Sequence, residues 1–299
     1  MGTTAAVLDA GLDLRPLHPL FAAEVVGLDL ARDDLDAAAF AALRAAFEAH
    51  SVLVVRDQGH LTPARHVAFS ARLGPLEVHV MRQFTLPDAP EVLRVSNERH
   101  PDGSPAGLAD AGRYWHSDLS YMAEPSLGSA LLARVLPSSG GDTLFASQHA
   151  AYNSLDAATR ARLRGLRAEH SYPYRAEIQA RVAGRPPLTE AQRAAVPPVV
   201  HPVVRRHDAT GRPALFVNEG FTTRVLGLAE DESRALLALL FAAATAPAVT
   251  YRHAWRPGDL VLWDNRAVQH LATPYPAGES RVMHRTTVRG AVPVAWDGG

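Results

Sequence analysis

The stretch TYRHAWRPGDLVLW at residues 250–263 indicates the fold class most directly, because two strand-forming segments enclose a turn. Residues 250–255 and 260–263 are rich in β-branched, aromatic and aliphatic side chains, which favour β-strands. Pro257, Gly258 and Asp259 between them have the chemistry of a turn. The stretch therefore predicts two strands that a turn connects.

Segments of the same kind recur along the chain, without an internal repeat. We expect further strands at residues 51–55, 92–95, 130–135, 198–205, 214–217 and 281–288, with a hairpin tip at 207–212. Helical spacing predicts helices at residues 34–50, 62–73, 158–166 and 230–244, the second of them capped by Thr62. Many strands with helices on one side favour a jelly roll. We therefore expect a mainly β fold with flanking helices, a cupin-like double-stranded β-helix, as one domain over residues 1–299.

Composition narrows the classes of protein. The 299 residues are 47% hydrophobic and 20% charged, which is enough to bury a substantial core. A net charge of −1 offers no electrostatic footprint for nucleic acid or an anionic membrane. The absence of cysteine excludes disulfides, thiolate metal sites and a cysteine nucleophile. Asp9 and Asp13 are unlike a secretory signal, and the longest apolar stretch, residues 236–249, is too short to span a bilayer. We expect a cytoplasmic protein.

The segment Trp115-His116-Ser117-Asp118 carries the candidate metal site. Its aromatic and apolar surroundings suit a strand, in which His116 and Asp118 point to the same side. With His270 downstream, they form the set of two imidazoles and one carboxylate that holds non-haem Fe(II) and leaves coordination positions open. The triplet His100-Pro101-Asp102 has the same pattern but lies in a Pro- and Gly-rich turn, so we do not expect it to bind metal.

Arg281 and Arg285 are the candidate anion-binding residues. They are four residues apart, so on a strand they share one face. Buried guanidinium groups are costly without anions, and their planar fork suits a carboxylate or a sulfonate. The pair therefore implies two acidic ligands, or one carboxylate of the protein for each. The alternative is an exposed strand face where both arginines are solvated.

The chain resembles the taurine dioxygenase (TauD/TfdA) family of Fe(II)- and 2-oxoglutarate-dependent dioxygenases over residues 15–292. The arginines follow His270 by 11 and 15 residues, the steps found in this family. The motifs that carry the resemblance are WHSD at 115–118, GGDT at 140–143, FVNEGF at 216–221, WDNRAVQH at 263–270 and RVMHR at 281–285.

The resemblance implies the roles of the main site residues. His116, Asp118 and His270 would bind Fe(II), while Thr143 and Arg281 would hold the far carboxylate of 2-oxoglutarate. Reaction with O2 would then yield succinate and CO2 and would hydroxylate or desaturate the substrate. Retention of Asp118 favours hydroxylation over halogenation, because halogenating relatives replace this carboxylate by a small residue. Segments near residues 79–114 and 173–198, with loops at 100–113 and 183–198, are expected to form lids.

The resemblance also implies a small anionic organic substrate whose acidic group contacts Arg285 and His79. His79 taken alone would more often be a packing residue. The other candidate substrate-binding residues are Leu119, Arg82, Tyr121, Tyr172 and Phe216. Arg82 has the alternative of an exposed lid position, and the three aromatic residues have the alternative of core packing.

The substrate class follows from departures from the family pattern. Arg82 and Gly112 stand where taurine-specific members have a tyrosine and an asparagine, so taurine itself is not expected. A sulfonate or a similar anion is the leading prediction. An alkyl sulfate, an aryloxyalkanoate or a secondary-metabolite acid is the alternative. Family members are commonly dimers or tetramers, which predicts a homo-oligomer.

Two other classes of function remain possible from the residues. A Zn(II) hydrolase with the same triad would leave Thr143 and Arg281 without a role. A non-catalytic jelly-roll binding protein would be expected to lack one of the metal ligands, and all three are present.

Overall fold

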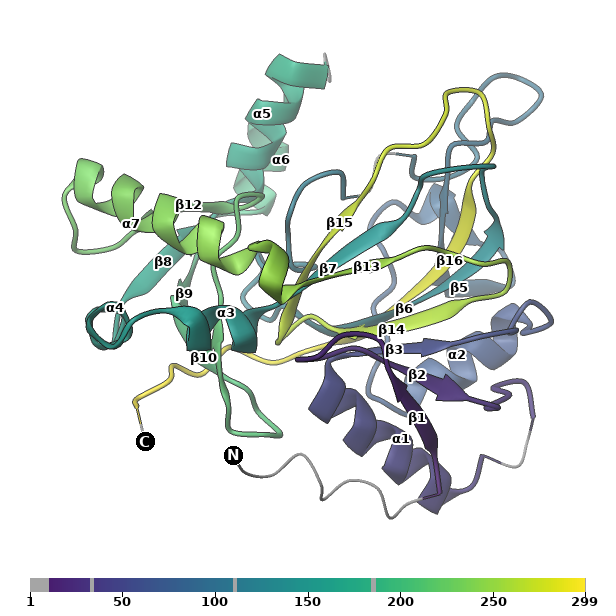
Figure 1. Ribbon diagram of the computed structural model, residues 1–299. Helices are drawn as coiled ribbons and strands as arrows, with labels where there is room; N and C mark the ends of the chain where they lie inside the picture. Colours follow the sequence, from purple (N-terminus) through teal and green to yellow (C-terminus); the bar gives the residue numbers. More distant parts are fainter. Residues whose placement is uncertain (1–10, 33–34, 110–111, 184–186, 299) are drawn as a thin grey trace.

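The largest element is a mixed eight-stranded sheet with the strand order β1-β2-β3-β14-β6-β16-β5-β4 (Figure 1). The computed structural model describes residues 11–32, 35–109, 112–183 and 187–298. Adjacent strands are antiparallel except for β2 and β3, which run parallel. The strands are β1 (Asp13–Pro16), β2 (Ala23–Val26), β3 (Val52–Val55), β4 (Thr85–Leu86), β5 (Ala89–Ser96), β6 (Ser126–Val135), β14 (Leu260–Asp264) and β16 (Val282–Arg289).

A second sheet faces the first. It consists of β13 (Thr250–His253), β7 (Thr143–Ser147) and β15 (Val268–Ala272), in that order. Side chains alternate between the two faces of β14. Val261 and Trp263 point toward the second sheet, where they pack with Phe145 of β7. Leu260 and Leu262 point to the opposite face. The large sheet is therefore apolar on both faces.

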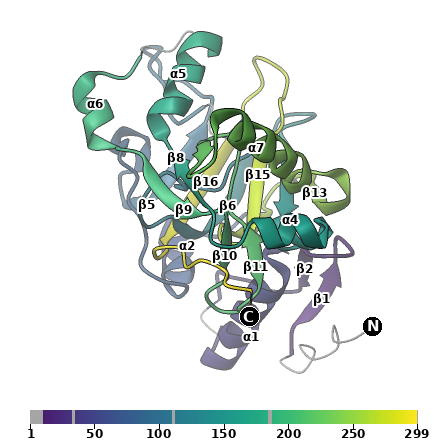
Figure 2. The same cartoon turned by 90° about the vertical axis from the view of Figure 1, so that its left-hand side faces the viewer.

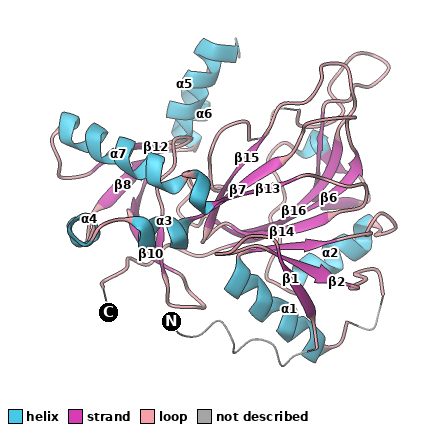
Figure 3. Ribbon diagram, viewed as in Figure 1, coloured by secondary structure: helices cyan, strands magenta, loops and turns pink. Residues whose placement is uncertain are grey.

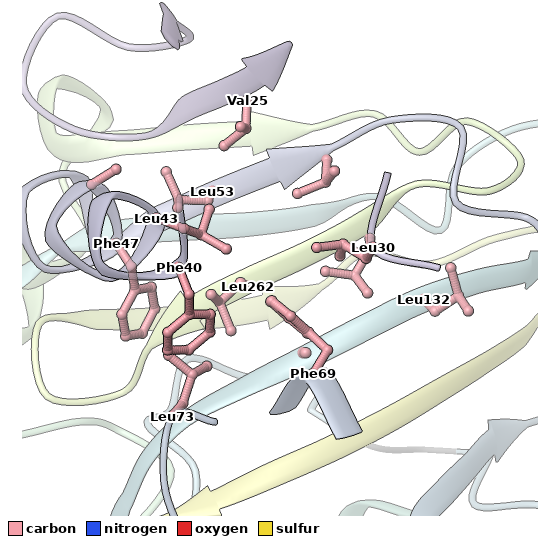
Figure 4. Packing of buried hydrophobic residues seen from close by; sticks show 14 of the residues in the cluster. Val25, Leu30, Phe40, Leu43, Phe47, Leu53, Phe69, Leu73, Leu132 and Leu262 are labelled. Atoms are coloured by element: carbon pink, nitrogen blue, oxygen red, sulfur yellow. The ribbon is translucent and has the colours of Figure 1, made fainter. Parts of the chain in front are cut away.

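Two helices cover that opposite face of the large sheet. They are α1 (Ala37–His50) and α2 (Pro63–Ala71). Figure 4 shows Phe40, Phe47 and Phe69 of these helices against Leu53 and Leu262 of the sheet. The side chains of Asp36 and Thr62 accept the hydrogen bonds that cap the two helices, as predicted for Thr62. The predicted start of the first helix, at residue 34, lies outside the described residues.

The remaining elements lie beside the two sheets and have a core of their own (Figure 2). The order of a three-stranded sheet is β12-β8-β9, and β10 and β11 form a hairpin. The helix α7 packs on this part and has the bounds predicted from the sequence. These elements are α3 (Gln148–Ser154), α4 (Ala157–Arg162), β8 (Arg167–His170), β9 (Val199–Pro202), β10 (Val204–Arg206), β11 (Pro213–Leu215), β12 (Thr222–Val225) and α7 (Glu230–Ala244).

The local structure of residues 183–205 differs from the prediction. The single strand expected at residues 198–205 is divided into β9 and β10, which pair in different sheets. The loop expected at residues 183–198 contains α6 (Glu190–Ala195), which follows the helix α5 (Tyr172–Ala183); both project from the body in Figure 3. Thr189 and Gln192 form a reciprocal capping box that starts α6. Within the described part of the chain, no helix is long and apolar enough to span a membrane.

Candidate active site

His116, Asp118 and His270 lie together, as the sequence predicted. Their potential ligand atoms are all within 4.8 Å of one another, and the three side chains are buried. The Nε2 atoms of His116 and His270 are 3.7 and 3.9 Å from Oδ1 of Asp118. This arrangement of two imidazoles and one carboxylate can hold a divalent metal ion on one side.

The backbone brings the two histidines together by an isolated antiparallel bridge. His116 N–H donates to the His270 carbonyl at 3.1 Å, and His270 N–H donates to the His116 carbonyl at 2.8 Å. The strand expected around His116 is therefore limited to this bridge, and residues 118–121 form a turn. The turn contains Leu119 at φ 58°, a conformation that is rare for leucine and has no signal in the sequence. Leu119 itself is partly exposed beside Asp118.

The orientation of the His116 ring is set from two sides. Nδ1 lies 2.9 Å from the Tyr114 carbonyl, which only accepts, so Nδ1 carries a proton and Nε2 is the ring atom that faces Asp118. Gly112 lies on the other side at φ 81°. A Cβ atom at this position would be 2.6 Å from Cε1 of His116. Residue 112 therefore cannot carry the asparagine of taurine-specific enzymes unless the histidine moves.

Substitution Gly112→Ala is expected to weaken metal binding about tenfold to a hundredfold, the usual effect of misplacing a ligand. The added methyl group would collide with the imidazole, and the positive φ would be strained. The measurement is a titration of the metal-free protein with Mn(II). Gly211→Ala, at a similar φ of 70° but with open space around it, is the control and should retain the wild-type affinity. Equal affinities of the two variants would contradict the prediction.

The His270 ring is enclosed by Phe145, Trp263 and His116. Burial, with the neighbouring His116, lowers the pKa of His270 to about 3, although Asp118 opposes the shift. The ring is therefore neutral near pH 7 and has a lone pair available for a metal ion.

The Asp118 carboxylate is ionised in spite of its burial. Burial alone would raise its pKa, but the positive charge of Arg285 holds the pKa well below its usual value. Arg285 donates from Nη1 to Oδ1 of Asp118 at 3.3 Å. Ser129 and Asn265 donate to the other oxygen, Oδ2. The site thus combines a negatively charged carboxylate with two imidazoles.

Arg281 and Thr143 form a candidate site for a carboxylate. Arg281 is 6% exposed, its Nε has no hydrogen-bond partner, and it makes no ion pair with the described residues. Burial lowers its pKa to about 10, so it remains charged. It lies against Gly141, two residues before Thr143. The Thr143 hydroxyl accepts from Trp255 at 3.1 Å, which leaves its own proton free to be donated.

Arg285 and His79 also lie close together. Burial and the charge of Arg285 lower the pKa of His79 to about 4, against the opposing effect of Asp118. Nδ1 of His79 accepts from Met81 N–H at 3.1 Å, so the neutral ring carries its proton on Nε2 and can donate there. The Nε of Arg285 is buried without a partner. Arg82, by contrast, is exposed at the start of a 3-10 helix, Arg82–Phe84.

Four aromatic residues, here called the aromatic cluster, lie beside His116. They include the predicted Tyr121 and Tyr172, whose ring centroids are 5.0 Å apart. Phe221 is 4.7 Å from Tyr121 and 6.3 Å from His116, and Tyr114 is 4.9 Å from His116. Sequence reasoning missed Phe221 and Tyr114, although Phe221 ends the FVNEGF motif and Tyr114 precedes WHSD.

The aromatic cluster is closed on one side by α5. Arg175 of this helix places its guanidinium carbon 3.6 Å from the centroid of the Tyr114 ring. A cation above an aromatic face is a favourable contact. The helix therefore holds a positive charge next to the rings that border His116.

Phe216, predicted as a substrate wall with core packing as the alternative, does not belong to the aromatic cluster in the described contacts. Its ring is 4% exposed and packs against His170, His201 and Arg205. This is the core-packing alternative. In the motif, Phe221 rather than Phe216 reaches the metal ligands.

Stability is expected to fall as the pH drops below 6.5. Burial, with the neighbouring His201, lowers the pKa of His170 to about 3. Between these two values the unfolded chain binds a proton that the folded chain excludes, so stability is complete above pH 6.5 and is lost on acidification. At about pH 5 the cost is about 2 kcal/mol for such a histidine. His170→Phe should reduce the loss measured by urea unfolding between about pH 7.5 and about pH 5.

The exposed His100 offers the control for this measurement. His100→Gln should leave the pH dependence as it is in the wild type. A wild-type pH dependence in the His170→Phe variant would show that His170 takes up its proton in the folded protein.

Comparison with known proteins agrees with this geometry. The sequence profile described as "Taurine catabolism dioxygenase TauD, TfdA family" matches residues 13–287. An (S)-phenoxypropionate/alpha-ketoglutarate-dioxygenase from Sphingobium herbicidovorans is 35% identical over 297 residues, covering 95% of this chain and 96% of the relative. An alpha-ketoglutarate-dependent 2,4-dichlorophenoxyacetate dioxygenase from Cupriavidus pinatubonensis is 37% identical over 281 residues, covering 91% and 96%.

Solved structures give the same result. The crystal structure of a taurine dioxygenase from Burkholderia xenovorans matches with a TM-score of 0.80 and 33% identity, covering 96% of this chain and 92% of that one. The agreement extends over almost the whole of both chains. The chain belongs to the TauD/TfdA family of dioxygenases.

Proposed function

We propose that this chain is an Fe(II)- and 2-oxoglutarate-dependent dioxygenase that hydroxylates a small anionic organic molecule and releases succinate and CO2. The proposal rests on the combination of the His116–Asp118–His270 cluster with a buried Arg281 that makes no ion pair with the described residues. Two imidazoles and a carboxylate suit Fe(II), and an unused guanidinium donor suits the carboxylate of a dicarboxylic acid.

Each residue then has a defined task. His116, the neutral His270 and the ionised Asp118 would hold the iron, which would supply the activation of O2. Arg281 and Thr143 would bind the far carboxylate of 2-oxoglutarate through their free donors. The aromatic cluster borders His116 and would keep water away from the reacting carbon.

The substrate's acidic group would bind Arg285 and His79. Both side chains offer a donor there, Nε of Arg285 and Nε2 of His79. The aromatic cluster beside His116 suits an aryl ring, because aromatic rings pack favourably edge to face. The proposal therefore prefers an aryloxyalkanoate to a small sulfonate, which reverses the order expected from the sequence. The two relatives described above are named for phenoxypropionate and 2,4-dichlorophenoxyacetate.

The other classes of function account for fewer observations. A Zn(II) hydrolase would leave the unpaired Arg281 without a ligand. A binding protein would not need three converging metal ligands beside a second anion site. An alkyl sulfate or a secondary-metabolite acid uses the same chemistry and is distinguished from an aryloxy acid by the experiment below.

The experiment has two steps. Anaerobic addition of Fe(II) and 2-oxoglutarate should produce a weak visible charge-transfer band, and its absence from iron-loaded protein would contradict the dioxygenase proposal. Aryloxy acids, alkyl sulfates, sulfonates and amino acids are then compared by substrate-dependent formation of succinate. Aryloxy acids should give the fastest formation. If a neutral compound is the best substrate, the roles of Arg285 and His79 are wrong.

We also infer that the two facing sheets form the double-stranded β-helix expected from the sequence. Their inner faces share one apolar core, to which Phe145 of the small sheet and Leu131 and Met283 of the large sheet contribute. Helices cover the outer face of the large sheet. Thr143 and His270 lie on the strands β7 and β15 of the small sheet, so the sandwich would position both sites.

A further inference from the structure

The buried side chain of Asn265 uses every polar atom that it has. It lies in the turn between β14 and β15 and is 1% exposed. Its Oδ1 accepts from the Asp118 backbone N–H at 3.1 Å and from Trp263 Nε1 at 3.0 Å. Its Nδ2 is 3.3 Å from Oδ2 of Asp118 and 3.1 and 3.3 Å from the hydroxyls of Ser126 and Ser129. Two N–H donors on one side and three oxygens on the other determine the amide orientation.

The two oxygens of the Asp118 carboxylate therefore have different surroundings. Oδ2 accepts from the Ser129 hydroxyl at 2.9 Å and from the Asn265 amide. Oδ1 faces Nε2 of His116 and of His270, and it accepts one hydrogen bond, from Nη1 of Arg285 at 3.3 Å. The donors hold one oxygen and present the other to the metal cluster.

The turn that carries Asn265 is itself held in place. The Asn265 carbonyl accepts from the Ser117 hydroxyl at 2.7 Å, and the Asn265 N–H donates to the Leu127 carbonyl at 2.9 Å. Asn265 thus ties the segment that contains Asp118 to the ends of β6 and β14. The Asp118 carboxylate is buried, so its partners are protein groups and not water. An ordered network of hydrogen bonds of this kind restricts its rotation.

We infer that Asn265 and Ser129 are positioning residues that make Asp118 a metal ligand through Oδ1 alone. The inference rests on the proposed function, in which His116, Asp118 and His270 bind a metal ion. A carboxylate that bound through both oxygens would take up a coordination position needed by 2-oxoglutarate or O2. The donors at Oδ2 prevent this, and they also orient Oδ1 before the metal arrives.

A pair of serines on β6 provides a matched test. Ser129 and Ser126 are both buried and both accept from Asn265, but Ser129 alone of the two donates to Asp118. The hydroxyl of Ser126 donates instead to the carbonyls of Gly128 and Val288. Ser129→Ala and Ser126→Ala each remove one buried hydroxyl from the same strand, so they separate an effect on Asp118 from a general loss of stability.

The first measurement is Mn(II) binding by the metal-free variants, together with their thermal unfolding. Ser129→Ala should weaken Mn(II) binding about tenfold to a hundredfold, and Asn265→Asp at least as much, whereas Ser126→Ala should stay close to the wild type. Equal Mn(II) affinity of the two serine variants would overturn the inference. If the wild type itself bound no metal ion, the proposed function would fail instead.

The second measurement is the affinity of the Mn(II)-saturated protein for 2-oxoglutarate. In Ser129→Ala the weakened hold on Oδ2 should allow it to compete for the metal, so the dissociation constant of 2-oxoglutarate should rise several-fold relative to Ser126→Ala. A purely structural role of Ser129 would lower the unfolding temperature without this difference. Unchanged 2-oxoglutarate affinity would therefore show that Ser129 does not keep Oδ2 away from the metal ion.

Discussion

Substitution of Asp118 by asparagine should abolish metal binding and leave the fold intact. Ser129 and Asn265 both donate to the position of Oδ2, so the amide oxygen of the new residue should occupy that position. Its NH2 group would then face Nε2 of His116 and of His270, where a metal ion needs a lone pair. Because the shape of the side chain is conserved, the neighbouring packing is retained.

The expected loss of turnover is at least about a thousandfold, equivalent to about 4 kcal/mol of activation free energy, because the metal-dependent chemistry disappears. Mn(II) titration, circular dichroism and succinate formation measure binding, fold and turnover of Asp118→Asn. Asp102→Asn is the control, since Asp102 belongs to the second His-x-Asp triplet and lies in an exposed turn. Wild-type turnover in Asp118→Asn, or lost turnover in Asp102→Asn, would show that the wrong triplet was assigned.

Substitution Asp264→Ala should be the most destabilising change outside the metal cluster. Asp264 is completely buried and accepts from Arg266 at 2.9 and 2.7 Å and from His207 at 2.9 Å. Burial alone would raise its pKa, but Arg266 and His207 lower the pKa far below the usual range. Removal of the carboxylate leaves the guanidinium of Arg266, which is 5% exposed, without its main partner.

An uncompensated buried charge of this kind costs about 3–5 kcal/mol of unfolding free energy. The melting temperature should fall by roughly 10 °C. Urea unfolding of the metal-free protein gives the free energy directly. Glu232→Ala breaks the exposed ion pair with Arg162 and should change stability by less than about 0.5 kcal/mol. If Asp264→Ala and Glu232→Ala lost similar amounts of unfolding free energy, burial would not be the cause of the effect at Asp264.

The location of the site explains why Asp264 matters for function as well. It directly precedes Asn265 in the turn between β14 and β15. Arg266 follows, so the ion pair fixes the turn on both sides of the asparagine. We expect Asp264→Ala to weaken Mn(II) binding in addition to its effect on stability, through the loss of order in this turn.

Elements with a strong local pattern were predicted well. The helix over residues 230–244 has three acidic residues in its first turn and an apolar stripe, and its bounds are confirmed. The strands around residues 260–263 and 281–288 are also confirmed. In these segments the side chains that favour the structure are neighbours in the sequence, so local reasoning is sufficient.

Predictions failed where contacts between distant segments override local preference. The segment around His116 has the composition of a strand, but a single bridge to His270 and the turn at Leu119 replace it. Phe216 and Phe221 stand in the same motif. Only the tertiary contacts show that Phe221 lies beside His116, whereas Phe216 packs against His170. The sequence pattern alone cannot rank two aromatic residues five positions apart.

The sequence by itself predicted the metal ligands and the two arginines, because two imidazoles with a carboxylate suit a divalent metal ion, guanidinium groups suit anions, and the spacing resembles that of the family. Tertiary structure decided how the ligands are held. Asn265 reaches Asp118 across 147 residues of sequence, and Gly112 leaves space for the His116 ring. Such contacts depend on the backbone approach of segments in different sheets and loops, which no local pattern of side chains encodes.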